Sequence, residues 1–175
     1  MPRILVGGMF LGRHVLGADV NYDVTVEEAS DGIAIDTEFP WLKGRGGSAR
    51  HLIIEQAQAH RGFRRRRFII IRPVPQTFTL DRAAALLRPA GYGVPSWHEA
   101  CALARSIADP AAYKLHRLIV PVEGLVVTES ASCSTLRPTA LLLDDELGWP
   151  SLHFTTNPAH FFAPHEDILM LEPEE

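Results

Sequence analysis

The stretch that specifies the fold best reads Thr77-Phe-Thr-Leu-Asp-Arg-Ala-Ala-Ala-Leu-Leu-Arg88 and, after a short break, Ser96-Trp-His-Glu-Ala-Cys-Ala-Leu-Ala-Arg-Ser-Ile-Ala-Asp109. Thr79 is a suitable N-cap for a helix that ends at the proline and glycines of the break. Ser96 and Glu99 have the Ser-x-x-Glu spacing of a capping box, which opens a second helix. The stretch therefore predicts a helical hairpin over residues 79–109.

The second helix of this hairpin has one apolar side. At 100° per residue its apolar side chains share one arc, which holds Trp97, Ala100, Cys101, Leu103, Ala104, Ile107 and Ala108. The opposite arc holds the polar side chains His98, Glu99, Arg105, Ser106 and Asp109. The pattern predicts that a sheet buries Trp97 and Cys101, and that His98 is exposed.

Short β-type segments surround the hairpin. Alternation of valines and a tyrosine with polar residues predicts a strand over residues 15–26, and the apolar run Phe68–Ile71 predicts a strand buried on both faces. Ser48 is suited to cap a helix over residues 49–60. Further strands are expected at residues 3–6, 32–36, 117–122, 124–128, 140–143, 152–155 and 168–171.

These elements predict an α+β fold. We expect one domain over residues 1–175, with a mixed or largely antiparallel sheet covered on one face by three short helices. The helices are those at residues 49–60, 80–88 and 97–108, and the last two form the hairpin.

Composition indicates a globular protein. Apolar residues make up 46% of the 175 residues, which is enough for a core, and no apolar run is long enough for a transmembrane helix. The start of the chain lacks a small-x-small cleavage site, and two cysteines are few for a disulfide framework. We therefore expect a cytoplasmic protein with no membrane contact and reduced thiols.

The net charge of −4 hides a strong segregation of charge along the chain. Residues 43–72 hold nine basic side chains and one acidic side chain, whereas residues 144–175 hold eight acidic side chains and no basic ones. Such asymmetry favours interaction surfaces, either for self-association or for separate partners.

Three segments of the chain carry a resemblance. They are Val20-Asn-Tyr-Asp-Val-Thr-Val-Glu-Glu-Ala29, Glu38-Phe-Pro40, and Leu86-Leu87 with Ala90-Gly-Tyr-Gly-Val-Pro-Ser-Trp-His-Glu-Ala-Cys-Ala-Leu-Ala104. This pattern resembles a group of small bacterial proteins that have an Asp-Tyr-Ser strand, Leu-Glu-Glu, Phe-Pro and a Pro-Ala-Thr-x-Glu-Glu-Leu-Leu-Ala-Leu-Ala helix. The resemblance covers roughly half the chain, and it implies a compact architecture but no activity.

The run Arg64–Arg67 is the most conspicuous polar feature. With Lys43, Arg45, Arg50 and Arg61 it forms a candidate basic patch that could bind an acidic protein or phosphates. The plainer interpretation is a solvated segment whose charges keep Phe68–Ile71 from pairing with other chains. The aromatic side chains that usually accompany single-strand nucleic-acid binding are missing beside the arginines.

A second candidate site lies near the C-terminal end of the sequence. His153, His160, His165, Glu166 and Asp167 could together supply metal ligands or an acid–base pair. Their spacing fixes no known ligand geometry, so the sequence favours no cofactor.

These observations favour a non-catalytic binding or assembly module that acts through protein–protein contacts, with a protein partner or self-association. Two alternatives stay open. One is a small metal-binding protein or enzyme that uses the histidine–acid cluster, and the other is nucleic-acid binding through residues 43–72.

Overall fold

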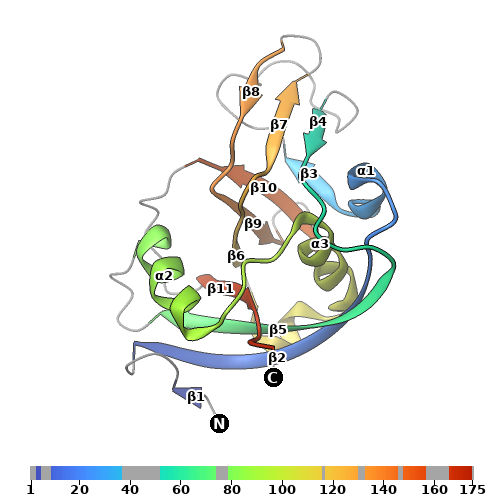
Figure 1. The fold of residues 1–175 in the computed structure, drawn as a ribbon. Helices are drawn as coiled ribbons and strands as arrows, with labels where there is room; N and C mark the ends of the chain where they lie inside the picture. Colours follow the sequence, from blue (N-terminus) through green and yellow to red (C-terminus); the bar gives the residue numbers. More distant parts are fainter. Residues whose placement is uncertain are drawn as a thin grey trace.

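The computed structural model describes residues 3–4, 9–36, 52–73, 79–115, 117–129, 133–145, 148–156 and 166–174, and Figure 1 shows their arrangement. Its elements are β1 (Arg3–Ile4), β2 (Phe10–Asn21), α1 (Val26–Ala29), β3 (Ala34–Asp36), β4 (Leu52–Glu55), β5 (Phe63–Pro73), α2 (Leu80–Leu87), η3 (Arg88–Ala90), α3 (Trp97–Ser106), η4 (Pro110–Tyr113), β6 (Arg117–Pro121), β7 (Val126–Glu129), β8 (Thr135–Leu136), β9 (Ala140–Asp144), β10 (Ser151–Thr155) and β11 (Glu166–Leu171). Among the helices of these ranges, none has the length and apolar content needed to cross a membrane.

The main sheet has eight strands in the order β1-β2-β5-β11-β6-β9-β10-β3. It is mixed, because β11 pairs in parallel with β6 and β10 pairs in parallel with β3, while the other neighbours are antiparallel. The longest pairing joins β2 to β5, from Phe10 opposite Pro73 to Asn21 opposite Phe63, with a β-bulge between Gly12 and His14. β2 and β5 thus form a long two-stranded ribbon at one side of the molecule (Figure 1).

Two hydrophobic clusters lie on opposite faces of this sheet. Successive side chains of a strand point to opposite faces, and in β5 Phe68 and Ile70 belong to one cluster while Ile69 and Ile71 belong to the other. The first cluster contains the apolar side of α3, and the second contains the buried side of α2. As predicted, residues 68–71 are buried on both faces.

The helix α3 forms as the sequence predicts. The Ser96 side chain accepts from the Glu99 amide and the Glu99 side chain accepts from the Ser96 amide, which completes the expected capping box. Trp97 and Cys101 are fully buried, so both predictions of burial are confirmed. The Trp97 ring stacks on Phe154 with centroids 5.9 Å apart, and its Nε1 donates to the carbonyl of Val26 at 2.9 Å.

The predicted fold class is nevertheless wrong, because strands dominate and the helices do not share a layer. Strands hold 45% and helices 22% of the described residues. Between α2 and α3 the chain passes the end of β11, where Gly93 and Leu171 exchange backbone hydrogen bonds of 3.1 and 2.8 Å. α2 and α3 consequently cover opposite faces of the sheet, not one face as a hairpin would.

The predicted helix at residues 49–60 is also wrong where the structure describes this segment. Leu52–Glu55 is strand β4, in which half-buried and exposed residues alternate. β4 pairs with β7, and β7 pairs with β8, in a separate three-stranded sheet at the end of the molecule opposite β2 (Figure 1). β-branched residues such as Ile53 and Ile54 suit a pleated strand better than a helix, and Ser48 lies outside the described residues.

The strand predicted at residues 15–26 is shifted. β2 ends at Asn21, and Thr25 then caps the short helix α1. Thr25 and Glu28 form a second capping box, with bonds of 3.1 Å from the Glu28 amide and 2.8 Å from the Thr25 amide. This local Thr-x-x-Glu signal outweighs the period-two alternation that continues through Val24 and Val26.

Candidate functional site

The arginine run forms the first half of β5 and lies on both sides of the β2–β5 ribbon. Opposite residues of an antiparallel pair point to the same face, and Arg65 stands opposite Asp19 while Arg67 stands opposite Gly17. We call the side that carries Phe63, Arg65, Arg67, Val15 and Asp19 the outer ribbon face. The inner ribbon face carries Arg64, Arg66, Ala18 and Val20, and it turns toward α3.

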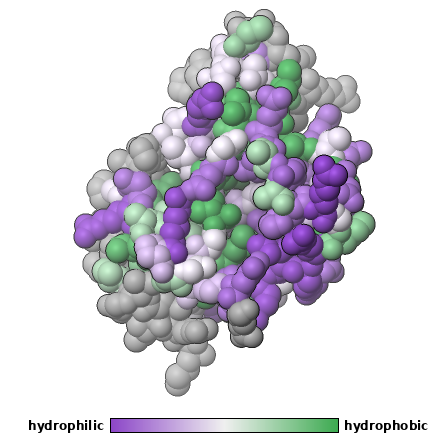
Figure 2. Space-filling model, viewed as in Figure 1, coloured by the Kyte–Doolittle hydropathy of each residue, from purple (hydrophilic) through white to green (hydrophobic). Residues whose placement is uncertain are grey.

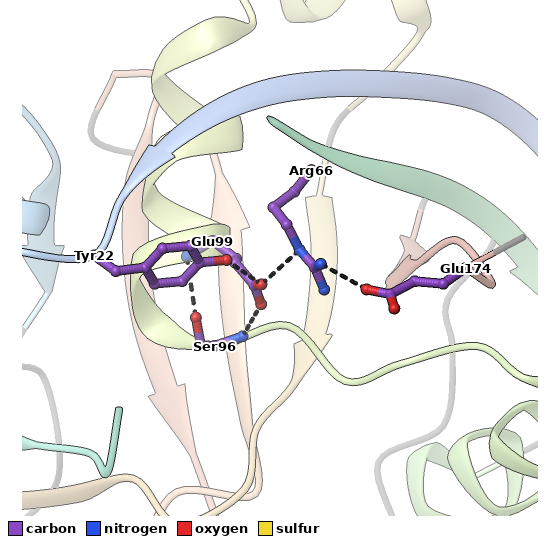
Figure 3. Close-up of polar contacts among 5 residues, drawn as sticks. All are labelled: Tyr22, Arg66, Ser96, Glu99 and Glu174. Atoms are coloured by element: carbon purple, nitrogen blue, oxygen red, sulfur yellow. Dashed lines mark hydrogen bonds and ion pairs between the residues drawn. The ribbon is translucent and has the colours of Figure 1, made fainter. Parts of the chain in front are cut away.

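On the inner ribbon face Arg66 joins a buried polar cluster, drawn in Figure 3. Glu99 is only 2% exposed, and its Oε1 accepts from the Tyr22 hydroxyl at 2.6 Å and from Arg66 Nε at 3.0 Å. Its Oε2 accepts from the Ser96 amide at 2.7 Å. Arg66 also donates from Nη1 to Glu174 at 2.8 Å, so its guanidinium lies between a buried and an exposed carboxylate.

The pKa shifts in this cluster have clear causes. Burial raises the pKa of Tyr22 strongly, and the hydrogen bond to the Glu99 carboxylate adds to the effect. Burial alone would lower the pKa of Arg66, but the hydrogen bond to Glu174 and the charge of Glu99 raise it overall. The hydrogen bond from Arg66 lowers the pKa of Glu174. All three shifts favour the neutral phenol and the two ion pairs.

The cluster explains an incorrect prediction for α3. His98 and Glu99 lie on the arc that the sequence assigned to solvent, yet both are buried. His98 Nε2 lies 2.9 Å from the Val24 carbonyl, which can only accept, and Gln58 also contacts its ring. Glu99 is covered by the ribbon through Tyr22 and Arg66. The second side of α3 is therefore covered by polar contacts, which helical periodicity cannot reveal.

The outer ribbon face exposes apolar and charged side chains together. Phe63 is 77% exposed and Val15 47% exposed, and both are large hydrophobic residues that the structure leaves exposed. Arg65 donates to Asp19 at 3.1 Å across the strand pair. The Arg65 guanidinium lies over Gly17, where an added Cβ would come within 2.9 Å of it, so this glycine leaves the space that the arginine occupies.

The segment Glu172–Glu174 follows β11 and lies along the ribbon beside the arginines. The Glu172 amide donates to the Arg67 carbonyl at 3.0 Å, and its carboxylate pairs with Arg67 Nη2 at 2.9 Å. A groove of about 260 Å³ is lined by Arg65–Arg67 and Glu172–Glu174. The end of the described chain thus lies near β5 (Figure 1) and supplies acidic groups to its arginines.

The structure divides the predicted basic patch. Lys43, Arg45 and Arg50 lie outside the described residues, and Arg61 is exposed just before β5. The run Arg64–Arg67 is part of a strand, not the start of a loop, and hydrophilic side chains gather along β2 and β5 (Figure 2). Arg65, Arg66 and Arg67 all pair with carboxylates.

The predicted histidine–acid cluster is not assembled in the described residues. His160 and His165 fall outside them. Glu166 and Asp167 are neighbours in β11 and point to opposite faces, where Glu166 contacts Arg117 and Asp167 contacts Arg13 and Arg72. Within the described ranges, no group of three or more His, Cys, Asp or Glu side chains is placed to hold a metal ion.

Of the predicted cluster, His153 and Glu166 are linked through Asp144 and Arg117. His153 Nε2 lies 3.3 Å from Asp144, a buried carboxylate that also pairs with Arg117 at 3.0 Å and accepts from the Ser151 hydroxyl at 2.7 Å. Asp144 Oδ1 contacts both the serine hydroxyl and the histidine ring, and Arg117 pairs with Asp144 and with Glu166.

The side chains that sequence reasoning missed are Tyr22, Glu99, Asp19 and Glu174. Glu99 was identified only as a cap, and Tyr22 only as one residue of an alternating strand. The charge segregation was the one sequence feature that indicated the remaining contacts, because arginines of the basic segment form ion pairs with glutamates of the acidic segment.

Three comparisons with known proteins complete this description: no protein-family model matches the chain, and neither the curated proteins nor the solved structures contain a match to it.

Proposed function

We propose that this chain is a non-catalytic binding module that acts through protein–protein contacts, with the outer ribbon face as its contact surface. The observation that carries the proposal is Phe63, which is 77% exposed on a strand whose next outward residues are Arg65 and Arg67. Aromatic and arginine side chains are enriched in the centres of protein interfaces and supply much of their binding energy.

The ion pair between Arg65 and Asp19 on this face supports the proposal, because it partly orders the guanidinium group before a partner arrives. Ordering in advance reduces the entropy that binding must offset. A fitting partner has an apolar depression for Phe63 and acidic or polar groups around it.

The same contacts give less support to nucleic-acid binding. Affinity for phosphates comes from cationic side chains that release counterions. The guanidinium groups of Arg65, Arg66 and Arg67 already face Asp19, Glu99, Glu172 and Glu174. A phosphate would therefore have to compete with carboxylates of the same chain.

Catalysis by the buried ionisable groups is also less supported. Glu99, Asp144, Glu166 and Asp167 are all buried, and each forms an ion pair with an arginine of the chain. Burial raises the pKa of the Cys101 thiol to about 12, so this group is a core residue and a poor nucleophile.

The test uses a photo-crosslinking amino acid, p-benzoylphenylalanine, at position 63. The control carries it at position 53, because Ile53 is also exposed but lies on the small sheet. We expect a defined product from position 63, either a second copy or another protein, and we expect Val15→Ser and Arg65→Ser on the same face to reduce it. Arg137→Ser, an exposed arginine at the end of β8, should leave the product unchanged. Equal products from positions 63 and 53 would reject the outer ribbon face as the contact surface.

A further inference from the structure

The segment Glu172–Glu174 covers the edge of β5 that faces away from β2. Strand β11 pairs with β5 from Ile168 to Leu171, and the Glu172 amide adds one bond to the Arg67 carbonyl. In the described residues, no backbone hydrogen bond joins the rest of this segment to Arg65 or Phe63. The first half of β5 is thus flanked by β2 on one edge and by an acidic segment with a single ladder bond on the other.

Among the described residues, the Glu172 amide bond and two ion pairs hold this segment, and Pro173 lies so near Gly91 that a Cβ added there would come within 3.3 Å of it. The side chain of Glu174 is 82% exposed, and exposed ion pairs contribute little individually, whereas the side chain of Glu172 is only 13% exposed. The Glu174 end of the segment is therefore displaced at a smaller cost in free energy than Glu172.

We propose that the groove between Arg65–Arg67 and Glu172–Glu174 binds an extended acidic peptide segment of a partner, and that the chain's own segment competes with it. This inference rests on the proposed function and names its ligand class. The peptide takes the direction of β11, antiparallel to β5, and its carboxylates replace those of Glu172 and Glu174 at Arg67 and Arg66.

Charge and backbone geometry both select this ligand. The groove of about 260 Å³ has three arginines on one side, and its acidic side belongs to the segment that leaves. An incoming strand can pair beyond Arg67 with the open edge at Arg65, which the chain's own segment does not do. Strand addition supplies main-chain hydrogen bonds for affinity, and alternate side chains then supply specificity.

The experiment measures fluorescence anisotropy with a labelled, acetylated Glu-Val-Glu-Val-Glu-Val amide. A peptide with Gln in place of every Glu is the control ligand. The proteins are the wild type, the double variant Glu172→Gln/Glu174→Gln, Arg67→Gln, and Arg137→Gln as a matched control for loss of one exposed arginine far from the groove. Arg66 is left unchanged because it also holds the buried Glu99.

We expect the double variant to bind the acidic peptide about 3-fold tighter than the wild type or better, and Arg67→Gln to bind it about 3-fold more weakly. Arg137→Gln should equal the wild type, and a rise in salt should weaken binding. Equal binding of the Glu and Gln peptides, or no gain in the double variant, would overturn the inference. If the crosslink from position 63 survives that result, only the ligand class is wrong; if both fail, the proposed function fails with it.

Discussion

The two halves of β5 differ sharply although they belong to one continuous strand. Phe68–Ile71 is buried on both faces and lies between β2 and β11. Phe63–Arg67 has the same partner β2 on one edge, but its outer face exposes Phe63 and Arg65, and among the described residues its other edge bonds only to the segment after β11. Because the pairing with β2 is the same in both halves, the difference in burial follows from what covers the faces and the second edge of the strand.

Within the first half the same contrast recurs between neighbouring arginines. Arg66 points to α3 and pairs with the buried Glu99, whereas Arg65 points to the outer ribbon face and pairs with the exposed Asp19. A buried ion pair loses much stability when one partner is removed, while an exposed pair contributes little. The contribution of each arginine to stability therefore depends on the face on which it lies.

The prediction with the largest expected effect tests the contrast between the two halves of β5. Ile70→Ala should lower the free energy of unfolding by about 2–5 kcal/mol, because it leaves a cavity beside α3. Phe63→Ala on the same strand should change it by less than about 0.5 kcal/mol. Urea unfolding of both variants measures the two values. A large loss for Phe63→Ala would mean that this side chain is covered in solution.

The second prediction concerns the inner ribbon face. Glu99→Gln keeps the shape of the side chain but removes the charge opposite Arg66, so we expect a loss of about 1–3 kcal/mol in the free energy of unfolding. Glu174→Gln, which changes the exposed partner of the same arginine, is the matched control and should lose less. Equal losses would show that burial does not strengthen this pair.

The third prediction follows from the raised pKa of Tyr22. Because the folded state keeps the phenol protonated, this contribution is fully present below the unfolded pKa near 10 and is lost as pH rises toward the folded pKa. Between about pH 9 and pH 11 the wild type should lose more stability than Tyr22→Phe. Urea unfolding across this range measures it, and parallel pH curves would contradict the shift.

Local signals predicted local structure well. The Ser96–Glu99 capping box, the burial of Trp97 and the doubly buried run Phe68–Ile71 are all present. Each depends on residues within one turn or one strand, so a single sequence contains the information. The predicted helix at residues 49–60 failed because tertiary pairing with β7 decided a short segment with a mixed pattern.

Non-local contacts could not be predicted in the same way. The amphipathic pattern of α3 shows one apolar arc, but nothing near Glu99 in sequence indicates that Tyr22 and Arg66 cover its other side. The placement of α2 and α3 on opposite faces depends on the pairing of Gly93 with Leu171, which are far apart in sequence. The charge segregation pointed to the correct segments, yet it suggested separate surfaces where the fold joins them.

The smallest expected effect lies on the outer ribbon face and sharpens the contrast with Arg66. The side chains of Arg65 and Asp19 are 64% and 70% exposed, and they form a cross-strand pair at 3.1 Å. A double-mutant cycle with Arg65→Gln and Asp19→Asn should give a coupling energy of about 0.2–1 kcal/mol that falls further as salt screens the charges. The control is Arg137→Gln combined with Asp19→Asn, which should show no coupling because β8 lies in the other sheet. Urea unfolding at low and high salt supplies the four free energies of the cycle. A coupling well above 1 kcal/mol that resists salt would mean that a second molecule shields this pair, and the outer ribbon face would then be occupied even in the purified protein.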